Sequence, residues 1–224
     1  MRRFLRENSL SIVFLALFLA AIGGQAIAGH ADFNDAADRH GDPHMSLARY
    51  VLSSDFGTAV MENWQSEYLQ FTLMILLTVW LVQKGSPESK ELAKAGRESD
   101  QVQKVGPYAQ QNSPRWAKLG GIRRTIYENS LVLVMGTFWV GTWLAQSVTG
   151  MVQYNSERLD HRGDPVSWSH YVTTPDFWEN TLQNWQSEFL AVGSMAILAV
   201  YLRQRGSPES KPVGAPHEST GVAG

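Results

Sequence analysis

The pentapeptide NWQSE occupies residues 63–67 and recurs at residues 184–188, 121 positions later. Two other blocks repeat with the same offset: ENSL at residues 7–10 and 128–131, and GSPESK at residues 85–90 and 206–211. Three separate blocks with one common offset indicate an internal duplication. We therefore divide the chain into repeat 1 (residues 1–90), a linker (91–121), repeat 2 (122–211) and a tail (212–224).

Each repeat carries two long apolar stretches. Thr174 as the N-cap, with Pro175 at the first helical position, is typical of a helix start. Gly85 and Gly206, each followed by Ser-Pro, are typical of helix ends. A bilayer core of about 30 Å takes about 20 apolar helical residues to cross. The sequence predicts four membrane-crossing helices, at residues 8–29, 54–84, 129–151 and 175–205.

These helices predict an all-α fold, an integral membrane four-helix bundle built from two parallel repeats of a transmembrane helical hairpin. A soluble fold would have to bury four apolar helices inside a small polar shell, so we set it aside. The linker lacks hydrophobic periodicity, apart from a helical turn expected near residues 92–97, and the tail is expected to be disordered. The absence of cysteine excludes disulfides and thiolate metal sites.

The basic residues are unevenly distributed. Fifteen of the 19 Lys and Arg lie at the N-terminus, in the segment from residue 84 to residue 124, or from residue 203 onward. The remaining four lie in the loops within the hairpins: Arg39, Arg49, Arg158 and Arg162. The positive-inside rule therefore predicts a multi-pass protein of the cell membrane with both termini and the linker in the cytoplasm.

Residues 1–28 also resemble a secretory signal, with arginines, an apolar run and Ala26-Ile27-Ala28 as a cleavage site. The equivalent segment, residues 123–150, begins with the same Arg-Arg pair but lies in the middle of the chain, where no signal peptide can act. We therefore expect the first helix to be retained. A mature N-terminus at Gly29 would contradict this expectation.

Small residues recur every four positions on the first helix of each repeat. They are Ala16, Ala20, Gly24 and Ala28 in repeat 1, and Thr137, Gly141, Ala145 and Thr149 in repeat 2. In lipid, such faces let helix backbones approach closely and gain dispersion contacts. The ridges predict a packing seam inside the bundle or, as the alternative, a face for homo-oligomer formation.

The NWQSE blocks place polar side chains on one face of the second helix of each repeat. Asn63, Ser66 and Glu67 follow the spacing i, i+3, i+4, and repeat 2 retains them as Asn184, Ser187 and Glu188. Gln25 and Gln146, on the first helices, are expected at a similar depth and are candidate partners of the two glutamates.

A charged side chain at the centre of a bilayer costs about 2.5–3.5 kcal/mol on insertion scales, and less near the interface. Three interpretations of Glu67 and Glu188 therefore stay open. The glutamates lie in the headgroup zone, or they belong to a hydrogen-bonded core, or they form a proton or cation site.

Other chemistry has little support in the sequence. The outer loops contain His30, His40, His44, His161 and His170 among aspartates, but their spacing matches no metal motif, and no metal or cofactor is predicted. Nucleophile elbows, phosphate-binding glycine loops and His-Glu-x-x-His patterns are absent, so no catalytic residue is predicted. The expected partners are the lipid bilayer and a second copy of the chain, without nucleic acid.

Several motifs carry a resemblance to a known family: Arg6 to Leu10, Gly29-His30, Phe33-Asn34, and the NWQSEYL and GSPESK blocks. Together they resemble an uncharacterised family of bacterial integral membrane proteins, a domain of unknown function, over nearly the whole chain. The resemblance implies a four-helix membrane protein and transfers no activity.

Three functions follow in order of preference. The first is a non-enzymatic structural or interaction component of the cell membrane. The second is a small transporter or channel element with a proton or cation site at Glu67 and Glu188. The third is a membrane-embedded enzyme, ranked last because no nucleophile and base fall at a workable spacing.

Overall fold

The computed structural model describes residues 2–223, and within this range the chain forms helices and turns without any strand. Its contacts divide the chain into two compact units. Unit 1 comprises Met1–Met61 and Gln146–Tyr171, and unit 2 comprises Glu62–Ala145 and Val172–Gly224. This division differs from the predicted repeats, because each unit takes segments from both of them.

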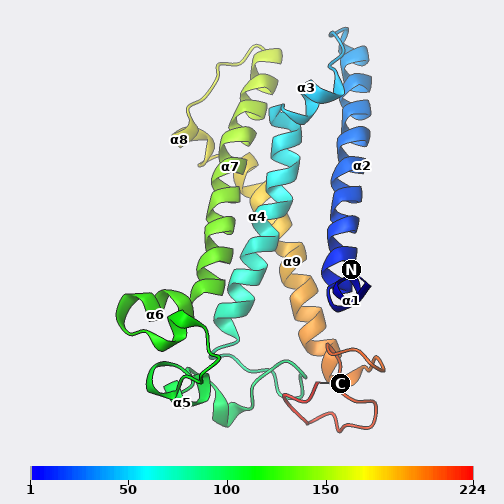
Figure 1. The fold of residues 1–224 in the computed structure, drawn as a ribbon. Helices are drawn as coiled ribbons and strands as arrows, with labels where there is room; N and C mark the ends of the chain where they lie inside the picture. The colour runs from blue at the N-terminus through cyan, green and yellow to red at the C-terminus, as the bar shows by residue number, and fades with distance from the viewer. Residues whose placement is uncertain (1, 224) are drawn as a thin grey trace. The chain divides into compact units, whose positions relative to one another are not determined.

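Unit 1 is built on α1 (Arg2–Glu7), α2 (Ser9–His40), α3 (Leu47–Val51), the start of α4 (Ser54–Leu77), the end of α7 (Ser130–Asp160) and α8 (Trp168–Tyr171). Unit 2 holds the remainder of α4 and α7, with η1 (Leu92–Lys94), α5 (Asp100–Gln103), η2 (Gly106–Tyr108), η3 (Arg115–Lys118), α6 (Gly121–Glu128) and α9 (Pro175–Tyr201). Figure 1 shows α3 as the short connection from the end of α2 to the start of α4. The turn expected near residues 92–97 corresponds to η1.

The predicted start of the last helix is confirmed. Helix α9 begins at Pro175, and the backbone N–H of Phe177 donates to the side-chain oxygen of Thr174 at 3.3 Å. This bond satisfies one of the N–H groups that a helix start leaves without a partner.

Two helices are longer than predicted. Helix α2 continues past residue 29 to His40 and ends at Gly41, whose positive φ of 75° lets its N–H reach the carbonyls of Ala37 and Asp38. Helix α7 likewise continues past residue 151 to Asp160. The apolar stretch ends earlier, but the following residues are compatible with a helix until a left-handed residue stops it.

Two helices are shorter than predicted. Helix α4 ends at Leu77 rather than residue 84, and α9 ends at Tyr201 rather than 205. A serine of each GSPESK block binds a backbone N–H that the longer helix would have used. Ser89 Oγ accepts from Gln83 N at 2.8 Å, and Ser210 Oγ accepts from Gln204 N at 2.9 Å. These bonds hold each loop in a folded turn instead of a further helical turn.

Within residues 2–223, two helices are long and apolar enough to cross a membrane, α2 and α7. Helices α4 and α9 do not reach that level, because the NWQSE blocks and neighbouring acidic residues make part of each helix polar. An integral four-helix bundle therefore stays a prediction, whereas the all-helical fold is observed.

The core of unit 1 is organised around two tyrosines. The buried ring of Tyr50 lies 5.7–6.0 Å from the rings of His30, Phe33 and Phe56. Tyr171, which is 2% exposed, lies 5.4 Å from the ring of Tyr154. Burial, with Asp55 and Asp32 nearby, raises the pKa of Tyr50 above its usual value, so the phenol stays protonated.

A paired asparagine contact closes the loop that follows α2 and the loop that follows α7, both in unit 1. Asn34 donates to the carbonyl of Met45 at 3.1 Å and accepts from its N–H at 2.8 Å. Asn155 makes the same two bonds with Val166, at 2.9 and 2.8 Å. Asn34 and Asn155 are 121 positions apart, as are their partners, so the two loops are closed in the same way.

Hydrogen bonds hold the tail in place up to Gly221, although disorder was predicted for it. The buried ammonium of Lys211 donates to the carbonyls of Pro216, His217 and Ser219 at 2.8–3.3 Å. Gly85 N donates to Thr220 Oγ1 at 2.9 Å, and Gly221 N donates to the carbonyl of Ser86 at 3.0 Å. The polar composition predicted disorder, but these bonds fasten the tail to the loop after α4.

Candidate functional site

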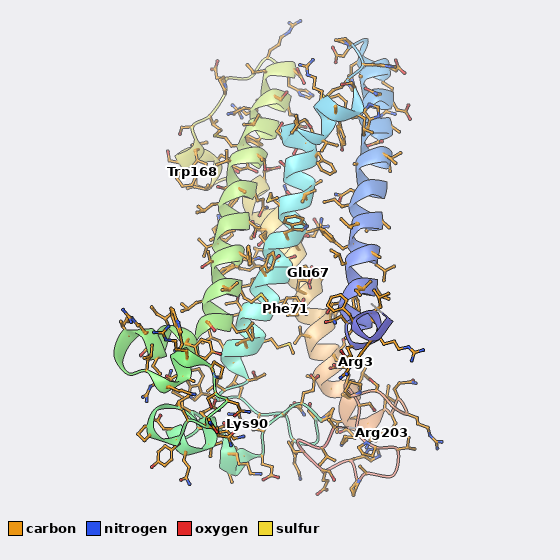
Figure 2. All side chains as sticks on the ribbon, in the orientation of Figure 1. Arg3, Glu67, Phe71, Lys90, Trp168 and Arg203 are labelled. Carbon is orange, nitrogen blue, oxygen red and sulfur yellow. The ribbon has the colours of Figure 1, made fainter. Side chains whose placement is uncertain are left out.

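The predicted polar residues of α4 and α9 meet inside unit 2. Ser66, which is 1% exposed, donates from its hydroxyl to Glu188 Oε1 at 3.3 Å and to the carbonyl of Asn63 at 2.9 Å. Glu67 interacts electrostatically with Glu188. Figure 2 shows Glu67 on α4 one turn from Phe71. The two glutamates of the duplicated motif are therefore neighbours, with a hydroxyl group beside them.

The other predicted members of this layer are arranged locally. Asn184 donates from its side chain to the carbonyl of Asn180 at 2.8 Å, and Ser187 donates to the carbonyl of Asn184 at 2.8 Å. Asn63 and Ser187 are exposed, and Asn184 is half-buried. The two copies of the motif therefore differ in burial, because the serine hydroxyl is buried on α4 and exposed on α9.

Gln65 is the central residue that sequence reasoning missed. It has no exposed surface, and its side-chain oxygen accepts from the indole N–H of Trp185 at 2.8 Å. Trp185 also lies 6.0 Å from Trp143, whose own indole N–H donates to the buried Thr181 at 3.4 Å. The only sequence signal for Gln65 was its identity with Gln186, which is exposed in the structure.

Gln25 and Gln146 are placed differently from each other. Gln25 is exposed on α2, whereas Gln146 is 1% exposed on α7. Within the described part of the chain, the amide oxygen of Gln146 has no hydrogen-bond partner. Both residues belong to unit 1, so their pairing with Glu67 and Glu188 of unit 2 stays a prediction.

The ridge on α2 is exposed at all four positions: Ala16, Ala20, Gly24 and Ala28. On α7, Thr137 and Gly141 are exposed, and Ala145 and Thr149 are half-buried. The methyl group of Thr149 lies so close to Gly57 that a Cβ there would be 3.1 Å away. Close helix approach is therefore observed at Thr149, and a role for the remaining ridge positions stays a prediction.

The histidines of the predicted outer loops have structural partners rather than a common centre. His30 contacts the carbonyl of Met45 at 2.7 Å, and His44 contacts Asp38 at 2.7 Å. His40 and His161 each reach the carbonyl four residues earlier, at 2.8 Å. Within residues 2–223, no cluster of three or more His, Asp and Glu side chains is arranged to hold a metal ion.

The two GSPESK blocks make parallel local contacts. In each copy the first serine accepts from the N–H of the glutamate, at 3.3 Å for both Ser86 and Ser207. The second serine accepts from a backbone N–H beyond the end of the preceding helix, and the lysine holds the segment that follows. Lys90 pairs with Glu98 at 3.0 Å and donates to the carbonyl of Gly96 at 3.2 Å.

The pKa values of one group in or near each block are shifted. The hydrogen bonds from Lys90 and Gln103 lower the pKa of Glu98 below its usual value. Burial and the nearby Arg203 lower the pKa of Lys211. Each lysine thus interacts with oxygen atoms of its own following segment.

A comparison with known protein families finds a match over nearly the full sequence. A family model described as a domain of unknown function (DUF6766) matches residues 1–222. The chain belongs to this family. No curated protein and no solved structure matches the DUF6766 chain. The family description names no activity, so function has to be argued from the residues of the DUF6766 chain itself.

Proposed function

We propose that this DUF6766 protein is a non-enzymatic, multi-pass component of the cell membrane with a structural or interaction role. Helices α2, α4, α7 and α9 cross the bilayer, and both termini and the linker lie in the cytoplasm. The supporting observation is the surface of α2, where large apolar side chains such as Leu10, Phe14 and Leu17 are each more than half exposed. Lipid solvates such a surface, and water does not.

Topology reporters test this proposal. We expect reporters fused at Gly224 and inside the linker, for example after Gln110, to be cytoplasmic. Reporters inserted after Asp42 and after Asp164 are expected on the outer side. A linker and a C-terminus on opposite sides of the membrane would contradict four crossings.

A transport role is the second candidate, and the contact of Ser66 with Glu188 favours it. Two neighbouring carboxylates with a hydroxyl donor are suited to bind a proton or a small cation. If the site works in transport, the double variant Glu67→Gln/Glu188→Gln should abolish cation-driven or proton-driven flux in proteoliposomes. Glu179→Gln, at an exposed position of α9, is the matched control. Equal flux in the double variant and the wild type would exclude this candidate.

A further inference from the structure

A groove of about 770 Å³ lies in unit 2 between α4 and α9. Its walls are mainly apolar and include Phe71, Met74 and Leu77 of α4 and Phe189, Val192 and Met195 of α9. Gly193 and Ala196, whose side chains are absent or small, leave room on the α9 wall. The volume falls within the roughly 300–1,000 Å³ typical of small-molecule sites.

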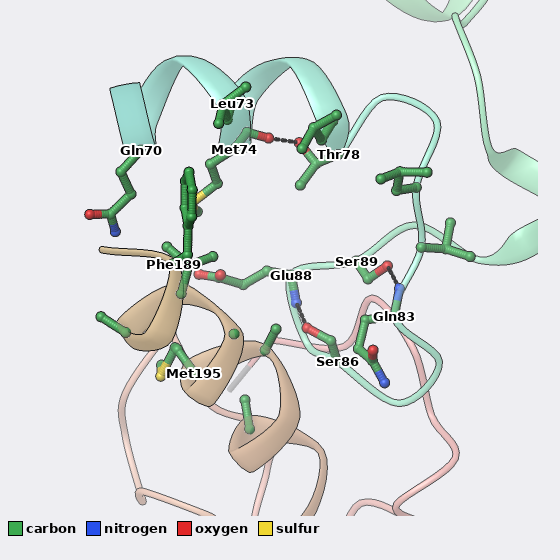
Figure 3. A pocket seen from close by; sticks show the side chains of 18 of the residues that line it. Gln70, Leu73, Met74, Thr78, Gln83, Ser86, Glu88, Ser89, Phe189 and Met195 are labelled. Atoms are coloured by element: carbon green, nitrogen blue, oxygen red, sulfur yellow. Dashed lines mark hydrogen bonds between the residues drawn. The ribbon is translucent and has the colours of Figure 1, made fainter. Parts of the chain in front are cut away.

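One end of this groove is acidic. Glu88 and Glu209, the glutamates of the two GSPESK blocks, both line it and share a hydrogen bond. In Figure 3 the Glu88 side chain extends toward the ring of Phe189. The duplicated motif thus contributes one carboxyl group from each copy to the same end of an apolar groove.

The cations near this end are engaged elsewhere. Lys84 pairs with Glu218 at 3.5 Å, and Lys90 pairs with Glu98. Lys211 donates to carbonyls of the tail, and Arg203 donates to the carbonyls of Val200, Leu202 and Ala215. Within residues 2–223, neither Glu88 nor Glu209 has an ion pair with a lysine or arginine of the chain.

We propose that this groove binds an amphiphile with one apolar tail and a monocationic ammonium head group. The tail lies between α4 and α9, and the head group lies against the carboxyls of Glu88 and Glu209. Charge complementarity selects this occupant, because an anionic head group would be repelled and a purely apolar molecule would leave the carboxyl pair unused. The site is separate from the Glu67 and Glu188 layer, and it does not depend on how many helices cross the membrane.

The carboxyl pair also predicts how binding responds to pH. The hydrogen bond with Glu209, together with burial and the charge of Glu209, raises the pKa of Glu88 to about 7. A cation binds best when both carboxyls are ionised, so binding releases the shared proton. The affinity should therefore rise about tenfold between pH 6 and pH 8.

The test uses full-length protein in phosphatidylcholine nanodiscs and radiolabelled dodecyltrimethylammonium, with binding to empty nanodiscs subtracted. We expect saturable binding at one site, weakened at least tenfold in Glu88→Gln/Glu209→Gln. Ala196→Phe, which fills the groove, should weaken binding to a similar extent. Glu179→Gln removes an exposed carboxylate of α9 outside the groove and should bind as the wild type does.

A competition experiment uses the wild-type protein alone, so it tests the proposal even if a variant fails to fold. Unlabelled dodecyltrimethylammonium should displace the probe, whereas tetramethylammonium and dodecyl sulfate at equal concentration should not. Unchanged binding in the folded double variant, or equal displacement by dodecyl sulfate, would overturn the proposal. Displacement by tetramethylammonium would show that the tail is not bound and would overturn it as well.

Discussion

The amide oxygen of Gln65 accepts a hydrogen bond from the indole of Trp185, and this contact joins α4 to α9 at a position with no solvent exposure. Replacing Gln65 with leucine keeps the approximate size of the side chain but leaves the indole N–H without its acceptor. We expect a loss of about 1–3 kcal/mol in the free energy of unfolding, measured by denaturation in detergent.

Gln186→Leu provides the matched control, because Gln186 is the duplicate of Gln65 and is exposed. Its effect should stay within about 0.5 kcal/mol. In Trp185→Phe, which removes the donor, the additional Gln65→Leu substitution should cost less than it does in the wild type. Equal costs in both backgrounds would show that the hydrogen bond contributes nothing.

Gly150 contacts the hydroxyl of Tyr171 so closely that an added Cβ would overlap with it. We expect Gly150→Ala to destabilise unit 1 by about 1–3 kcal/mol, because the tyrosine must shift within a packed core. The measurement is the thermal unfolding midpoint in detergent.

Two further variants separate this overlap from a general effect of alanine. Gly150→Ala/Tyr171→Phe lacks the clashing oxygen and should recover part of the loss. Gly193→Ala, where a Cβ meets nothing within 4 Å, should be neutral or stabilising, because alanine favours a helix by about 1 kcal/mol over glycine. If Gly150→Ala were as stable as Gly193→Ala, the close contact would be without consequence.

Lys211 fastens the tail by donating to three carbonyls, and its removal should release them. We expect Lys211→Met to increase amide hydrogen exchange in residues 216–221 by at least tenfold, while the helices keep their protection. Lys94→Met, which removes an exposed lysine whose ion pair with Glu91 lies outside the tail, should leave tail exchange near the wild-type rate. Unchanged exchange in Lys211→Met would mean that other contacts hold the tail.

The shared proton of Glu88 and Glu209 should also affect stability. The pKa of Glu88 is raised to about 7 in the folded protein, so the folded state binds this proton more tightly than the unfolded state does. The resulting stabilisation is complete below about pH 4.5, the usual pKa of a glutamate, and is lost as the pH rises through 7. The temperature of the unfolding midpoint should therefore decrease as the pH is raised from 5.5 to 8.5.

Glu88→Gln should reduce this fall, and Glu218→Gln should not. The comparison within each variant across pH matters more than the absolute midpoint, because the substitutions have their own effects on stability. A wild-type midpoint that rises over the same range would contradict the shared proton.

The sequence predicted helix starts better than helix ends. Thr174 and Pro175 act on neighbouring N–H groups, so their effect could be derived locally. The segment after α4, which was predicted as helix, is held instead by Ser89 binding Gln83 N and by Gly96 N donating to the carbonyl of Val79 at 2.7 Å. Such bonds form only once the loop has folded back, and hydrophobic periodicity carries no information about them.

The candidate site shows the same division. The spacing of Ser66 and Glu67 predicted a polar face, and the structure places Glu188 beside Ser66. The sequence could not show that Gln65 is buried and Gln186 is exposed, since the two copies have the same local sequence. The rotation of each helix against its neighbours determines which glutamine is buried, and this rotation depends on tertiary packing.

The hydrogen bond from Gly85 to Thr220 joins residues 135 positions apart. The loop after α4 therefore cannot complete its bonding until Thr220 and Gly221 have been synthesised. During translation, α4 must therefore form before the loop that follows it can close. Biogenesis should thus include a late closing step, which makes a truncation before Thr220 harmful to a loop encoded far upstream.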